Sequence, residues 1–268
     1  MQSAYPVKHL SYSSIYAYLN CGYNWKLKYI DKIDAPSSPA LVFGGVFHEA
    51  VEHYLRAKVK GESEDLRELW HEAWLQKMDD PKLDVEWGDK GVDFYRDDGE
   101  RILSSPDVVA RIDSVRPQIT TDGEAALETR VSMWIDDVPV PIIGYVDLIE
   151  EDGIPGDFKT SSAMWSKGKP ANEIQPIIYL DALHKGEVID PSEYRFRHYV
   201  FTKAKKPRAE VFETTRSPGE IRWMHDMVRD VWQSMQAGIY VTNPLSWKCN
   251  SRNCEYWDAC RGKAIRGL

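Results

Sequence analysis

The sequence predicts an α/β protein in which helices flank a central mixed sheet. A run rich in β-forming residues begins at Ala126 and gives three or four strands by about residue 160. A helical pattern over 172–186 separates these strands from a second strand pair over 194–214. Helical patterns also precede the first strand and follow the last. This order of elements is typical of one sheet covered by helices.

The part of the chain before residue 116 is expected to be helical. Ser13 or Ser14 is the expected N-cap of a first helix that continues to about Ile30. Residues 79–90 are polar and irregular and predict a loop. Apolar residues at helical spacing predict further helices over 46–61, 62–78 and 92–115.

Turn residues divide the strand region. Asp136-Asp137 separates strands over 126–135 and 138–149, and the link from Glu150 to Gly153 predicts a β-hairpin with the strand that follows. The alternating segments 194–202 and 209–214 predict a second hairpin with a basic loop at its tip. A long helix is expected over 218–238.

Composition fits a folded, soluble chain. The 268 residues are 43% hydrophobic and carry a formal net charge of −8, which disfavours a protein that coats DNA non-specifically. No apolar run reaches the ~18 residues of a membrane span, and the first residues lack the apolar region of a secretory signal. We therefore expect a cytoplasmic protein of one large domain or two small ones, with no membrane partner.

The hairpin over 142–160 carries the most informative side chains. Its two apolar runs each end in an acid, Asp147 and Asp157. Lys159 lies two positions after Asp157, so both point to the same side of a strand. Clustered carboxylates repel each other unless a divalent cation neutralises them. The pattern suggests a Mg²⁺ or Mn²⁺ site that hydrolyses phosphodiesters, although a hairpin with solvated charges would also contain it.

Two further segments add candidate residues. His48 lies one turn after Gly44-Gly45, near an expected helix start where another element can approach closely. Gln175 and Tyr179 lie at i, i+4 on one face of a helix, where simple packing is the alternative interpretation.

Together these segments closely resemble the PD-(D/E)XK nuclease superfamily. The similarity is to its RecB-like branch, which includes the CRISPR-associated Cas-four exonucleases and the AddB nuclease domain. Four motifs of that branch occur here in its order: Gly44-Gly-Val-Phe-His48, Gly144-Tyr-Val-Asp147, Asp157-Phe-Lys159 and Gln175-Pro-Ile-Ile-Tyr179.

The resemblance implies a restriction-endonuclease-like core and a role for each motif residue. Residues 1–268 would form a single nuclease domain, with 62–121 as a possible helical insertion. Lys159 would position or deprotonate the attacking water, or offset charge on the phosphate. Gln175 and Tyr179 would orient the lysine or the DNA backbone. The implied metal ligands are His48, Asp147, Asp157 and the main-chain carbonyl of Phe158.

The chain has four cysteines: Cys21, Cys249, Cys254 and Cys260. Disulfides are disfavoured in the cytosol, so an iron–sulfur cluster, a zinc site or ordinary thiols remain open. The segments around Cys21 and over 241–268 resemble the opening helix and closing cysteine cluster that hold a [4Fe–4S] cluster in the Cas-four-like and AddB-like proteins. The late spacing here is C-x4-C-x5-C, two residues longer in its first gap than the C-x2-C-x5-C typical of the family.

The resemblance implies a metal-dependent DNA exonuclease that prefers single-stranded ends and degrades them 5′→3′. Alternatives are an endonuclease, a CRISPR spacer-processing subunit, or a non-catalytic DNA-binding module of the same fold. No helicase motif is visible in the sequence, so a helicase or recombination protein would be a separate partner.

Overall fold

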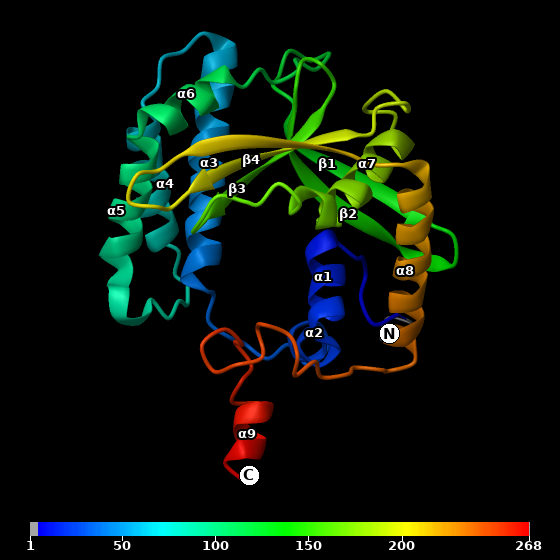
Figure 1. Ribbon diagram of the computed structural model, residues 1–268. Coiled ribbons are helices and arrows are strands. Elements are labelled where there is room, and N and C mark those ends of the chain that lie inside the picture. The colour runs from blue at the N-terminus through cyan, green and yellow to red at the C-terminus, as the bar shows by residue number, and fades with distance from the viewer. Residues whose placement is uncertain (1–4, 268) are drawn as a thin grey trace. The chain divides into compact units, whose positions relative to one another are not determined.

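A computed structural model describes residues 5–267 and shows the predicted α/β fold (Figure 1). Five strands form one mixed sheet in the order β1–β2–β3–β4–β5. Pairing is antiparallel between β2 and β3 and between β4 and β5, and parallel between β3 and β4. Both predicted hairpins are therefore present. The strands are β1 (Leu127–Ile135), β2 (Val138–Ile149), β3 (Pro155–Ser161), β4 (Arg195–Thr202) and β5 (Ala209–Thr215).

The contacts divide the chain into two compact units. We call one the central unit; it comprises Ser37–Val131 and Tyr145–Ser217. The other, the terminal unit, comprises the N-terminal segment to Pro36, Ser132–Gly144 and the segment from Pro218 onward.

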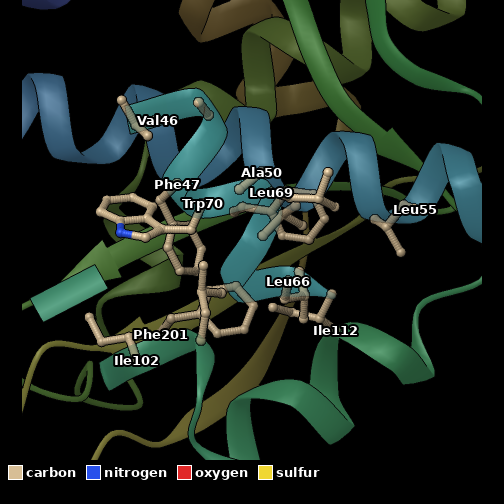
Figure 2. Packing of buried hydrophobic residues seen from close by; sticks show 14 of the residues in the cluster. Val46, Phe47, Ala50, Leu55, Leu66, Leu69, Trp70, Ile102, Ile112 and Phe201 are labelled. Atoms are coloured by element: carbon tan, nitrogen blue, oxygen red, sulfur yellow. The ribbon is translucent and has the colours of Figure 1, made fainter. Parts of the chain in front are cut away.

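The core of the central unit lies between its helices and one face of the sheet. Phe47 packs on Phe201 with 5.2 Å between ring centroids, and both belong to a cluster of buried apolar side chains (Figure 2). Trp70 is fully buried there, and its indole lies where a side chain at Gly99 would have to go. The helices that supply this core are α3 (Pro39–Lys60), α4 (Leu66–Met78), α5 (Gly91–Leu103) and α6 (Pro106–Ser114).

Strand alternation gives the sheet of the central unit two differently covered faces. Phe158 and Phe201 pack with the α3 cluster on one face. Phe196 lies five residues before Phe201 on β4 and meets Tyr179 of α7 (Gln175–Lys185) at 6.4 Å on the other. Helices α3 and α7 therefore cover opposite faces, and the strands between them present side chains to both.

The terminal unit joins the two ends of the chain. It contains α1 (Tyr12–Asn20), α2 (Gly22–Tyr29), α8 (Pro218–Gln236) and α9 (Arg261–Ile265). Trp25 is fully buried and stacks on Tyr240 at 5.9 Å. The Tyr256 hydroxyl donates to the carbonyl of Ile33 at 3.2 Å. These contacts pack the closing segment, which is the part of the chain after α8, against α2 and the residues just after it.

The predicted N-terminal helix is wrong in its continuity. Cys21 has an extended backbone and separates α1 from α2, and Ser11, not Ser13 or Ser14, caps α1 by accepting from the Ser14 amide. The break accommodates the closing segment, because a Cβ on Gly22 would lie 3.1 Å from the nitrogen of Val241.

Two other helix boundaries also differ. The predicted helix over 92–115 is interrupted before Pro106, which has no amide hydrogen and holds Ser105 extended. Helix α3 starts at Pro39 with Ser38 as its N-cap, so Gly44-Gly45 lies inside it; the helix ends, as predicted, at Gly61 in the left-handed conformation.

Across residues 5–267, no helix combines the length and apolar character needed to cross a lipid bilayer.

Candidate active site

The two acids of the β2–β3 hairpin face each other. Leu148 lies opposite Gly156, so the next step of the antiparallel register brings Asp147 opposite Asp157. Residues opposite each other on antiparallel strands share a face of the sheet. The amide of Phe158 donates to Oδ2 of Asp147 at 2.8 Å and ties this carboxylate to the neighbouring strand.

Helix α3 brings His48 to the same place. Its Nδ1 lies 3.3 Å from Oδ2 of Asp147, and its ring meets the ring of Phe158 edge-on with 6.2 Å between centroids. Burial lowers the pKa of His48, although Asp157 acts in the opposite direction. Neutral imidazole is the form that binds metal ions. His48 lies in the middle of α3, and not near a helix start as expected, because the helix begins at Pro39.

Glu128 is a further candidate site residue, which the sequence analysis missed. One ligand atom each of His48, Glu128 and Asp147 lies within 4.8 Å of the others. Glu128 adopts a left-handed backbone with φ of 49°, which is uncommon for any residue other than glycine. Arg56 donates to the carbonyl of Leu127 at 3.1 Å, directly before this strained residue. The only sequence signal was an acid among β-forming residues at the start of β1.

The electrostatics of this cluster favour a cation. Burial and then Asp157 raise the pKa of Asp147 well above its usual range. Burial, followed by Glu52 and Asp157, raises the pKa of Glu128. A divalent cation would relieve both effects, and carboxylate oxygens with an imidazole nitrogen are donors that Mg²⁺ or Mn²⁺ accepts. The residues present therefore fit such an ion.

Asp157, Lys159 and Gln175 form a closed triangle of interactions. Lys159 Nζ lies 2.7 Å from Oδ2 of Asp157 and donates to Oε1 of Gln175 at 2.9 Å. Gln175 Nε2 donates to Oδ1 of Asp157 at 2.8 Å. Gln175 is the first residue of α7, and both its side chain and that of Asp157 are buried. Three predicted site residues are thus brought into direct contact.

The triangle fixes the charge of the lysine. Burial alone would lower the pKa of Lys159, but the Asp157 carboxylate outweighs it and the pKa is raised. Tyr179 lies one turn further along α7, where burial raises its pKa and its hydroxyl interacts with Gln175. The tyrosine therefore stays neutral and supports the glutamine.

The four cysteines all belong to the terminal unit and none forms a disulfide. Burial and then neighbouring thiols, with Cys21 first among them, raise the pKa of Cys260. Cys254 is shifted in the same direction by burial, Glu255 and Cys21. Within residues 5–267, however, no three cysteine sulfurs lie within 4.8 Å of one another. The thiols are neighbours without forming a tight group.

Comparisons with known proteins agree with this geometry. A family model described as the PD-(D/E)XK nuclease superfamily matches residues 9–261. No curated protein matches the sequence. A crystal structure of a "Putative exonuclease" from Eubacterium rectale is similar, with a TM-score of 0.53 and 12% identity over 95% of this chain and 88% of that chain. At this identity the likeness concerns the fold alone. Because the family model spans nearly the whole sequence, the chain belongs to the PD-(D/E)XK nuclease superfamily.

Proposed function

We propose that this protein is a Mg²⁺- or Mn²⁺-dependent DNA exonuclease that degrades single-stranded DNA from the 5′ end. The observation that carries the proposal is the convergence of His48, Glu128 and Asp147 beside the Asp157–Lys159–Gln175 triangle. Membership of the superfamily supports phosphodiester hydrolysis. The four motifs in the order of the RecB-like branch support a Cas-four-like exonuclease, and the 5′→3′ direction is inherited from that resemblance and from no residue of this chain.

The acidic cluster would hold the metal ion. His48, Glu128 and Asp147 would supply ligand atoms, with Asp157 and the main-chain carbonyl of Phe158 as further candidates. When bound, a divalent cation would polarise the scissile phosphate and lower the pKa of an attacking water.

Lys159 would act as a cation in this site. Its raised pKa keeps it protonated, so it would offset negative charge on the phosphate and orient the water by donating to it. Gln175 holds the lysine against Asp157 and thereby restricts the positions that its ammonium group can take.

Digestion of labelled oligonucleotides tests this function. Single-stranded substrates carry the label at the 5′ or the 3′ end, and a circular single strand serves as a control without ends. With Mn²⁺ we expect the 5′ label to appear at once in short products while 3′-labelled strands shorten gradually, and EDTA to stop both. The circle should stay intact.

Other outcomes would overturn the proposal. Cleavage of the circle would indicate an endonuclease or a spacer-processing subunit. Binding without cleavage under every metal tested would indicate a non-catalytic DNA-binding module. By contrast, degradation of a tailed duplex only with an added helicase would agree with the proposal and show that unwinding comes from a separate partner.

We also propose that Cys21, Cys249, Cys254 and Cys260 hold a [4Fe–4S] cluster. The four thiols lie in one unit, and the Cys21 thiol acts to raise the pKa of both Cys254 and Cys260. Thiolates are the donors that iron–sulfur clusters require. Protein purified without oxygen should show a broad brown absorbance with about four irons per chain. A colourless protein with one zinc per chain would replace the cluster with a zinc site and leave the nuclease proposal intact.

A further inference from the structure

The segment between β3 and α7 determines where Gln175 lies. It spans 162–174 and contains one short 3-10 helix, Pro170–Asn172. Ile174 is the N-cap residue of α7, and its side chain makes no capping hydrogen bond to α7. A glutamine at the first position of such a helix is only as fixed as the segment that leads into it.

Arg216, directly after β5, binds this segment. Its Nη1 donates to the carbonyl of Ala171 at 2.8 Å, and its Nη2 donates to the carbonyls of Pro170 at 2.6 Å and Glu173 at 2.8 Å. The side chain is 6% exposed. Burying a guanidinium is costly unless its donors are satisfied, and the planar fork of arginine reaches several acceptors in one fixed geometry. Lysine cannot reproduce that geometry.

We propose that Arg216 is a positioning residue for the nuclease reaction and acts through Gln175. By holding the carbonyls over 170–173, it fixes the start of α7 and therefore the amide that bridges Asp157 and Lys159. If this segment slackened, the lysine would lose the neutral partner that limits its movement. The inference rests on the proposed nuclease function and concerns a residue outside the four motifs.

A double-mutant cycle separates positioning from general support of the fold. Arg216→Lys and Gln175→Ala should each lower kcat by about 10- to 100-fold with little change in KM. In the Gln175→Ala background, Arg216→Lys should cost less than about threefold, because both changes remove the same constraint. The proposal would be overturned if the loss of kcat in the double mutant equalled the product of the two single losses. A wild-type kcat for Arg216→Lys would also overturn it.

Arg197 provides a matched control. It is a partly buried arginine on β4 that binds Glu150, Asp152 and Glu213, and none of these lies in the 162–174 segment. Arg197→Lys should lower the melting temperature as Arg216→Lys does but leave kcat near the wild-type value. If Arg216→Lys does not fold, Arg216→Gln takes its place in the cycle. Unlike lysine, glutamine leaves no charge buried at this position.

Hydrogen exchange gives a readout that does not depend on cleavage. Amides over 170–178 should exchange at least about tenfold faster in Arg216→Lys than in the wild type or Arg197→Lys. Unchanged protection there would overturn the proposal even if activity fell. If the wild type cleaves no DNA, the proposed function fails, and exchange still decides whether Arg216 fixes the start of α7.

Discussion

The acidic site of the central unit and the thiols of the terminal unit are held in different ways. Asp157, Lys159 and Gln175 bind one another at 2.7–2.9 Å. By contrast, the sulfur of Cys254 accepts a long contact from Asn24, at 3.9 Å. The side chains of the candidate site are therefore organised by their own interactions. The thiols form no disulfide, and no three of their sulfurs lie within 4.8 Å of one another in the part of the chain that the structure describes.

The largest expected effect tests the triangle formed by Asp157, Lys159 and Gln175. Asp157→Asn should lower kcat by about 10³-fold while the protein stays folded, because the amide keeps the shape of the carboxylate but loses its charge toward Lys159 and the cation. Steady-state kinetics with Mn²⁺ and circular dichroism measure the two parts of this prediction.

Asp152→Asn is the matched control. Asp152 lies in the turn of the same hairpin and binds Arg197 at 2.7 Å, away from the triangle. Its replacement should leave kcat near the wild-type value. Equal losses in both variants would mean that the hairpin responds to any lost acid and that the triangle has no special role.

A smaller effect tests whether Glu128 belongs to the metal site. Glu128→Gln should raise the Mn²⁺ concentration for half-maximal activity by about 10- to 100-fold and largely preserve kcat at saturating metal. Glu124→Gln, at an exposed position just before β1, is the control. An unchanged Mn²⁺ requirement would restrict the ligands to His48 and the hairpin acids.

The third prediction concerns the thiols. If a bound group closes their arrangement, Cys254→Ser should abolish the brown absorbance and lower the melting temperature by roughly 5 °C. Ser251→Ala, in the same segment, should change neither. A Cys254→Ser protein that keeps its colour and stability would show that this thiol is no ligand, and the contrast between the two regions would lose its basis.

The sequence predicted those parts of the site that depend on local signals. The β2–β3 hairpin follows from alternating residues and a turn at Gly153, which has φ of 80°. Once that hairpin forms, Asp157 and Lys159 share a face, and only the approach of Gln175 requires tertiary structure. Local patterning therefore anticipated the fold class and much of the candidate site.

Two of the missed features, Glu128 and the break at Cys21, depend on distant residues. Glu128 reaches the cluster through an unusual backbone conformation beside Leu127, whose carbonyl accepts from Arg56 on α3. The break at Cys21 depends on the approach of Val241 to Gly22. Neither contact leaves a periodic pattern, so no reading of local spacing could have found them.

The smallest expected effect concerns the loss of stability that comes from holding buried acids close together when no metal is bound. The pKa of Asp147 is raised by burial and then by Asp157, so this group favours the folded state below the ordinary aspartate pKa of about 3.9. That contribution is lost as pH rises through the raised folded value. In EDTA the wild-type melting temperature should therefore fall relative to Asp147→Asn, by a few degrees, as the pH rises above about 4. Adding Mn²⁺ at neutral pH should reverse the order, because only the wild type gains a ligand for the ion. If the melting temperatures of the two proteins in EDTA changed equally with pH, the charged Asp147 would not destabilise the metal-free protein.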